Sequence, residues 1–239
     1  MARINGEAGK HQADTTRQRL NRLITLIVCA VGGIGFACGI CINKSNLWAL
    51  ILLVTVVSSL VWMHRYSNKQ IRQIGCDRKG ETGETRVATF LAELPDTYWV
   101  FNDMAFADSY GNIDHIVIGP TGFFAIDTKN WNGVVTADGK GELCLNHKPT
   151  DKPLIKRFVR RAMELRNRIK ALKRLDLYIQ ALFVFPYTGV DAKWGSTGAV
   201  HCMHASQLED YILGKEGKTL SPQEVNELAK CIKLLVETK

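Results

Sequence analysis

The feature that most limits how this chain can fold is a run of residues without a charged side chain. The run covers residues 23–42, and 15 of its 20 residues are apolar. As an α-helix rising about 1.5 Å per residue it would be roughly 30 Å long, the thickness of a bilayer core. A second uncharged run follows at residues 47–63, with 14 apolar residues among 17. The two runs predict a transmembrane hairpin of two helices.

Basic residues flank the predicted hairpin at both outer ends. They are Arg17, Arg19 and Arg22 before it, and Arg65, Lys69 and Arg72 after it. The positive-inside rule then places both termini in the cytoplasm. We therefore expect a multi-pass protein of the inner membrane, with the lipid bilayer as a partner. Two other interpretations stay open: a cleaved signal peptide for the first run, and a buried helical hairpin of a soluble protein.

Composition narrows the class of the remaining chain. Apolar residues make up 46% of the 239 residues, which excludes general disorder. The seven Cys form no paired Cys and His clusters, which argues against a zinc module or a secreted disulfide scaffold. The net charge of +8 reflects 31 Lys and Arg against 23 Asp and Glu.

Beyond the apolar runs, helical and strand patterns alternate, which predicts an α/β domain. We expect strands at 98–102, 113–118, 123–129 and 178–185, a short strand after 133, a weaker strand at 198–203, and helices at 80–94, 154–175, 206–213 and 221–236. The predicted organisation is a basic N-terminus (1–22), the hairpin (23–63), a juxtamembrane linker (64–79), an α/β domain (80–205) and a helical extension (206–239).

Three charged residues converge on the predicted hairpin of 113–118 and 123–129. A turn at residues 119–122 would place Asp114 directly opposite Asp127, where like charges destabilise a sheet. A divalent cation, Mg²⁺ or Mn²⁺, would offset that repulsion. Alternation puts Lys129 on the same face as Asp127. The set suits metal-assisted hydrolysis of a phosphodiester. The alternative for Asp127 and Lys129 is a pair of solvated charges at a strand end.

Glu84 is a candidate third acid. On the predicted helix it shares a side with Val87, Leu91 and Leu94, which faces the sheet. A buried carboxylate is costly unless it is paired or bound to metal. The alternative is an acid in the first turn that the helix dipole stabilises.

The long helix at 154–175 carries nine Lys or Arg residues and one acid. Candidate contacts to a phosphate backbone are Lys156, Arg157, Arg160 and Arg161. A solvated outer face and a surface for anionic lipid are the other interpretations of this helix.

Three motifs in order resemble the nuclease-related domain (NERD) family, a branch of the PD-(D/E)XK nuclease superfamily. They are Gly-Glu-Thr-Gly-Glu at 80–84, Gly-Asn-Ile-Asp-His-Ile-Val-Ile-Gly-Pro at 111–120 and Phe-Ala-Ile-Asp-Thr-Lys-Asn at 124–130. The resemblance covers about residues 75–205. It implies a restriction-endonuclease-like mixed sheet flanked by helices, with Glu84, Asp114, Asp127 and Lys129 as the catalytic set.

Two positions depart from the family pattern. The family usually has Glu where Asp127 stands, and related domains often carry Gln on the next long helix. No Gln occurs between 150 and 179, so Lys156 or Arg160 would have to serve. The sequence as a whole predicts a membrane-anchored, metal-dependent nuclease that acts on DNA rather than RNA. The rival is an inactive membrane-tethered module that binds nucleic acid or acts as a scaffold.

Overall fold

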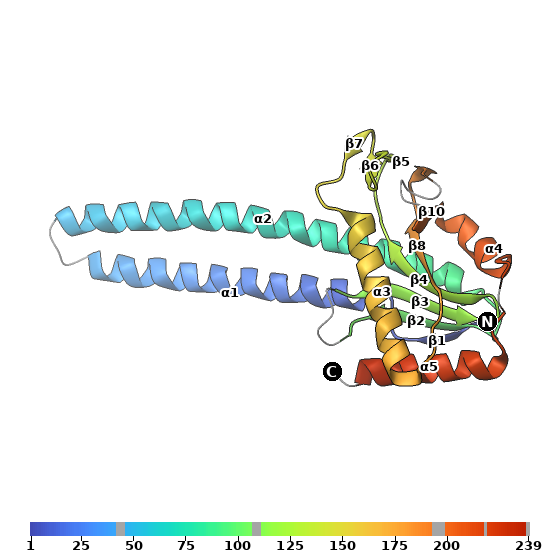
Figure 1. Cartoon of the computed structure of the whole chain (residues 1–239). Coiled ribbons are helices and arrows are strands. Elements are labelled where there is room, and N and C mark those ends of the chain that lie inside the picture. Colours follow the sequence, from blue (N-terminus) through green and yellow to red (C-terminus); the bar gives the residue numbers. More distant parts are fainter. Residues whose placement is uncertain (42–45, 107–110, 193–198, 218, 238–239) are drawn as a thin grey trace. The chain divides into compact units, whose positions relative to one another are not determined.

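The protein is described by a computed structural model that covers residues 1–41, 46–106, 111–192, 199–217 and 219–237. The chain forms two compact units. Residues 11–79 make a helical unit, and residues 1–10 together with 80–239 make an α/β unit. Figure 1 labels the helices and strands of both units.

The helical unit consists of two long helices, α1 (Lys10–Cys41) and the first part of α2 (Asn46–Ala92). An ion pair joins Arg19 Nε to Asp77 Oδ2 at 3.1 Å. Since Arg19 lies early in α1 and Asp77 lies late in α2, the pair shows that the two helices are antiparallel. The segment 64–79, expected as a linker, is an uninterrupted part of α2.

The predicted transmembrane hairpin over 23–63 is wrong. Among the residues that the structure describes, no helix is long and apolar enough to cross a membrane. The apolar runs are parts of α1 and α2, and both helices continue through charged sequence, α1 from Lys10 and α2 through 64–79. Residues 42–45, where the first run ends, lie outside the described residues. The predicted multi-pass location in the inner membrane is contradicted with it.

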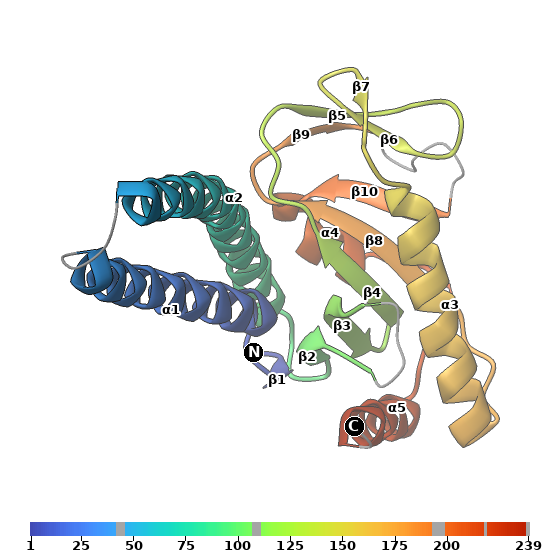
Figure 2. The same cartoon turned by 90° about the vertical axis from the view of Figure 1, so that its left-hand side faces the viewer.

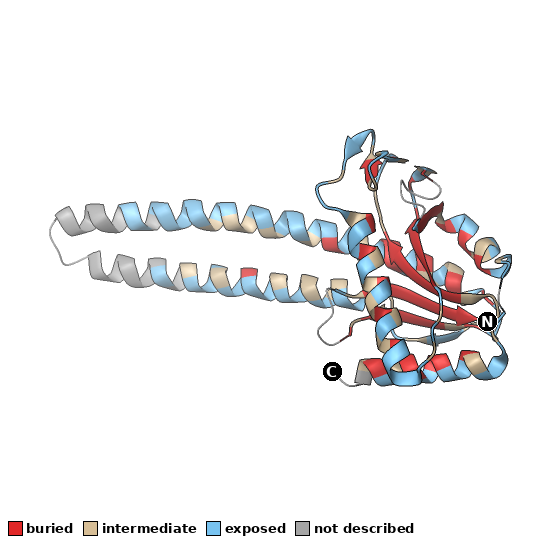
Figure 3. Ribbon diagram, in the orientation of Figure 1, coloured by how far each residue is buried: buried red, intermediate tan, exposed pale blue. Residues whose placement is uncertain are grey.

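The α/β unit is built on a six-stranded mixed sheet of order β1-β2-β3-β4-β8-β10. Its strands are β1 (Arg3–Asn5), β2 (Trp99–Met104), β3 (Ile113–Gly119), β4 (Gly122–Thr128), β8 (Ile179–Phe185) and β10 (Val200–His204). The antiparallel pairs are β2 with β3 and β3 with β4, and the other neighbours are parallel. Strands β3 and β8 are buried along their whole length (Figure 3).

The hairpin of β3 and β4 turns more tightly than the sequence predicts. Gly119 pairs with Gly122, so only Pro120 and Thr121 lie between the strands. A Cβ on Gly119 would lie 2.0 Å from Cδ1 of Tyr98, so no larger residue fits there without displacing that ring. The Tyr98 hydroxyl hydrogen-bonds Thr121 Oγ1 at 2.9 Å, which ties β2 to the turn. The turn therefore fixes the register of the two strands.

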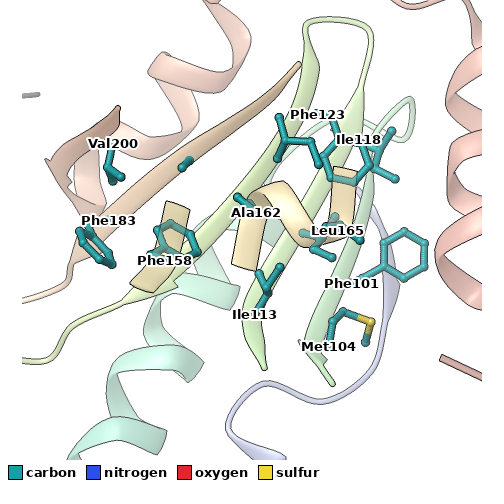
Figure 4. Close-up of a cluster of buried hydrophobic side chains, with 14 of the residues drawn as sticks. Phe101, Met104, Ile113, Ile118, Phe123, Phe158, Ala162, Leu165, Phe183 and Val200 are labelled. Atoms are coloured by element: carbon teal, nitrogen blue, oxygen red, sulfur yellow. The ribbon is translucent and has the colours of Figure 1, made fainter. Parts of the chain in front are cut away.

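Helices cover both faces of this sheet. One face carries α3 (Leu154–Lys173) and α5 (Pro222–Glu237), as Figures 1 and 2 show. The apolar stripe of α3 follows helical spacing, and Phe158, Ala162 and Leu165 point into the core of this face (Figure 4). The other face packs against Val87 and Leu91 of α2 and against α4 (Leu208–Leu213), which follows a short 3₁₀ helix, η1 (Ala205–Gln207).

A second, four-stranded sheet has the order β7-β6-β5-β9. Its strands are β5 (Val134–Ala137), β6 (Leu143–Leu145), β7 (Lys148–Pro149) and β9 (Gly189–Asp191). The loop before β6 supplies Glu142, whose carboxylate accepts hydrogen bonds from the backbone N–H groups of Ile155 at 2.8 Å and Lys156 at 3.0 Å. These are donors in the first turn of α3, which no carbonyl of the helix can satisfy. Glu142 thus caps α3.

The predicted α/β class is confirmed, because a mixed sheet is flanked by helices. The strands predicted around the hairpin and at 178–185 and the helices at 154–175, 206–213 and 221–236 are all present, with ends shifted by a few residues. The two transmembrane helices of the prediction are not supported.

Candidate active site

Two buried aspartates lie side by side where the hairpin of β3 and β4 ends. The ladder of β3 and β4 ends with the pair of His115 and Ile126, so Asp114 and Asp127 are the next residues on each strand, in the register that the sequence predicts. Asp114 is 7% exposed and Asp127 is 1% exposed. Two carboxylates in adjacent buried positions repel each other unless cations compensate them.

Two basic side chains bind Asp127. Lys129 Nζ forms an ion pair with Asp127 Oδ1, and Arg161 Nη2 forms one with Oδ2. Arg161 Nη1 also donates to the carbonyl of Asn112, which precedes β3, and Lys129 Nζ donates to the carbonyl of Thr128 at 3.2 Å. Both oxygens of Asp127 are therefore engaged, and α3 is joined to the strand ends through Arg161.

Asp114 is held by weaker contacts. Its Oδ2 accepts a hydrogen bond from the backbone N–H of Thr128 at 2.7 Å. Burial and the charge of Asp127 raise the pKa of Asp114 to about 7, although Lys129, the Thr128 N–H and Arg161 oppose the rise. The ion pairs of Lys129 and Arg161 are thus made with Asp127, and these two cations only partly offset the cost of a charge on Asp114.

Asp127 and Lys129 shift in the opposite sense. Burial raises the pKa of Asp127, but Lys129 and Arg161 outweigh it and hold the pKa below its usual range. Burial lowers the pKa of Lys129, and the nearby charges of Asp127 and Asp114 more than reverse this. At neutral pH, Asp127 is an anion and Lys129 is a cation.

Glu84 approaches from the other side of the sheet. It is 3% exposed, as its place on the apolar stripe of α2 predicts, and α2 packs on the face opposite to α3. The adjacent Gly83 lies against the segment after Asp127, because a Cβ there would be 2.8 Å from Cβ of Asn130. Within the described ranges, no three His, Cys, Asp or Glu side chains are grouped to hold a metal ion.

Of the four basic residues predicted on α3, only Arg161 contacts the acid pair. Lys156, Arg157 and Arg160 are exposed on the outer side of the helix. We expected Lys156 or Arg160 to supply the polar group from this helix, and Arg161 occupies that position instead. The sequence feature that indicates this is its spacing from two buried residues. Arg161 lies three residues after Phe158 and four before Leu165, on the same side of the helix.

His115 faces away from the acid pair and is fully buried. Its Nδ1 is 2.9 Å from Asn102 Oδ1, a hydrogen bond between neighbouring strands. Burial lowers the pKa of His115 to about 3, against a smaller opposite effect of Asp127. The imidazole is therefore neutral at physiological pH.

The donor set at the hairpin fits a divalent cation. Mg²⁺ is commonly held by one or two protein carboxylates, with water and substrate phosphate completing its ligands. Asp114 and Asp127 can supply such a pair, and a cation beside Asp114 would offset the burial and the charge of Asp127 that raise its pKa. A cation there would have to share Asp127 with Lys129 and Arg161.

Comparison with known proteins finds a similarity to one family over part of the chain. Residues 79–186 match the model of the nuclease-related domain, NERD. An uncharacterized protein of Bacillus anthracis is 39% identical over 66 residues, which is 26% of this chain and 31% of that protein. No solved structure matches the chain. The NERD match includes Glu84, Asp114, Asp127, Lys129 and Arg161, so the resemblance of the three motifs to this family is confirmed over these residues.

Proposed function

We propose that the α/β unit is a metal-dependent nuclease with a restriction-endonuclease-like fold that hydrolyses phosphodiester bonds of nucleic acid, DNA in preference to RNA. One observation carries the proposal: Asp114 and Asp127 lie together in a buried position with Lys129 and Arg161, inside the region that matches NERD. Two buried acids side by side destabilise the fold. Binding of a cation and a phosphate at this position would explain why the chain retains them.

Asp114 and Asp127 would hold Mg²⁺ or Mn²⁺, and Glu84, on the opposite side of the sheet, is the candidate third acid. The bound ion would polarise the phosphate and lower the pKa of a water molecule. Lys129 contributes a cation that binds a non-bridging oxygen of the phosphate and balances the charge that develops there. Arg161 has a planar guanidinium suited to two phosphate oxygens, and its contact with the Asn112 carbonyl orients it.

The test is cleavage of labelled single-stranded, duplex and branched DNA, and of RNA, by the purified chain with Mg²⁺ or Mn²⁺. We expect hydrolysis that stops in EDTA and is lost in Asp127→Asn and Lys129→Ala. Asp151→Asn is the matched control, since Asp151 is exposed before α3. Hydrolysis that persists in Asp127→Asn would refute the assignment.

A second readout follows the cation without cleavage. A ligand that binds only the folded state raises the melting temperature. We expect Mn²⁺ to raise it for the wild type and for Lys129→Ala, and to raise it less for Asp127→Asn. If neither cation shifts the wild type at millimolar concentration, these aspartates are not a metal site.

The second candidate is a module that binds nucleic acid without cleaving it. Two observations support it. Both oxygens of Asp127 already pair with Lys129 and Arg161. The part of the chain that the structure describes also contains no group of three His, Cys, Asp or Glu side chains that could hold a metal ion. This candidate predicts binding of DNA with neither cleavage nor a shift of melting temperature by Mn²⁺.

A further inference from the structure

An exposed tyrosine lies at the edge of the sheet that carries the candidate active site. Tyr187 follows β8 directly after Phe185 and Pro186, and 47% of its surface is exposed. β8 is the parallel neighbour of β4, with Asp127 paired to Phe183, so both strands end at the same edge of the sheet. The chain after β8 therefore emerges next to the chain after Asp127.

Hydrogen bonds fix these two exit segments to each other. Lys129 N donates to the carbonyl of Val184 at 2.9 Å, and Gly189 N donates to the carbonyl of Gly133 at 3.2 Å. Between them, the buried hydroxyl of Thr188 donates to the carbonyl of Trp131. Tyr187 is thus carried by a short segment anchored on both sides to the segment that starts with Lys129.

A third element reaches the same tyrosine. The guanidinium carbon of Arg86 lies 4.6 Å from the centre of the Tyr187 ring. Arg86 is two residues after Glu84 in α2, and the same turn of α2 touches Asn130 through Gly83. A guanidinium over an aromatic face is attracted by the ring's quadrupole and restrains its orientation. Arg86 therefore supports the ring while its side chain stays exposed.

An oriented, exposed ring at the same sheet edge as the proposed phosphate-binding residues has a clear chemical use. Nucleobases stack on aromatic side chains whatever their sequence, because every base has a π-face. In a duplex those faces are covered by neighbouring base pairs, whereas an unpaired base can be splayed onto a protein ring. A stacking tyrosine selects for unpaired nucleotides.

We infer that Tyr187, restrained by Arg86, stacks on an unpaired base beside the phosphate that Lys129 and Arg161 bind, so that the site takes single-stranded nucleic acid. The inference rests on the proposed function for the nature of the ligand. Tyr187 is a binding residue and takes no part in bond cleavage.

The test uses the full chain in EDTA and fluorescence anisotropy with two probes, a labelled oligo(dT) of about 15 nucleotides and a blunt duplex of the same length. Tyr187→Ala should weaken binding of oligo(dT) on the order of 10-fold, the range found for loss of one stacked base. The duplex should lose much less. Tyr187→Phe should bind as the wild type does, because it keeps the ring.

Tyr178 gives a matched control, since it is an exposed tyrosine that precedes the opposite end of β8. Tyr178→Ala should bind both probes as the wild type does. Arg86→Gln should weaken oligo(dT) binding, because the ring loses its support. The inference is overturned if Tyr187→Ala binds oligo(dT) normally, or loses affinity for both probes equally.

Cleavage separates this inference from the proposed function. If the wild type cleaves DNA with Mn²⁺ and Tyr187→Ala has an unchanged KM for single strands, the stacking role fails and the nuclease stands. If no variant cleaves but Tyr187→Ala selectively loses oligo(dT), the stacking role stands and hydrolysis fails. If the wild type binds neither probe, both are overturned.

Discussion

Replacing Asp114 by Asn should make the metal-free protein more stable at neutral pH and leave its stability unchanged in acid. Asn keeps the size of the side chain and an oxygen that can accept the Thr128 N–H, which Asp114 Oδ2 accepts at 2.7 Å. Only the charge is lost. The substitution therefore measures the cost of the second buried carboxylate beside Asp127.

The size of the effect follows from proton linkage. The pKa of Asp114 rises from 3.8 to about 7 on folding. Well below pH 3.8 the carboxyl is protonated in both states and costs nothing. Between these values the unfolded chain gives up a proton that the folded protein keeps, so the free energy of unfolding falls as pH rises. A difference of about three units corresponds to about 4 kcal/mol above pH 7, at about 1.36 kcal/mol per unit.

The assay is urea denaturation of both proteins in EDTA at about pH 4, 5.5 and 8, read as the difference in the free energy of unfolding. The difference between the two proteins is used because His115 also makes stability depend on pH in this range, and its effect has the opposite sign to that of Asp114. The pKa of His115 is lowered from 6.5 to about 3, so acid destabilises the fold through it in both proteins. Asp151→Asn should show no such pH dependence. A difference that is zero or destabilising at pH 8, or equal at every pH, would refute an uncompensated Asp114.

Substitutions at three further positions test the fold around the site. Gly119→Ala should lower the free energy of unfolding by about 1–3 kcal/mol, because its Cβ would overlap the buried Tyr98 ring; an unchanged urea midpoint would contradict this close packing. Glu142→Ala should cost about 1 kcal/mol by uncapping α3, and Glu142→Gln, which keeps one acceptor, should cost less in the same assay; equal losses would mean that the cap is not the cause. His115→Gln should flatten the loss of stability below about pH 6.5, since no buried imidazole remains to take up a proton; an unaltered acid limb would rule out that role.

The hairpin of the site could be predicted because local rules determine it. A turn rich in Gly and Pro sets the register, and alternation then places Asp114 beside Asp127. The burial of Glu84 followed in the same way from helical spacing. Each of these inferences needs only one or two neighbouring elements.

Features that depend on distant packing could not be predicted. Eight basic residues lie in α3, and which of them reaches Asp127 depends on how the helix is rotated against the sheet. β1 is a three-residue strand with no apolar pattern, and it forms because β2 offers an open edge. The transmembrane prediction rested on the lack of charged residues in two runs, whereas no helix in the described part of the chain is long and apolar enough to cross a membrane.

The pairing of β1 with β2 makes the helical unit an excursion from the α/β unit. β1 (Arg3–Asn5) precedes residues 11–79 in the chain, and its partner β2 follows them. Glu81, just after the helical unit, lies against Gly9, just before it. The entrance and exit of the excursion are thus neighbours within one folded body. Such an insertion can be exchanged or shortened without moving the strands that it interrupts, since loop-closure entropy changes only slowly with length. Evolution could therefore alter the helices independently of Asp114 and Asp127.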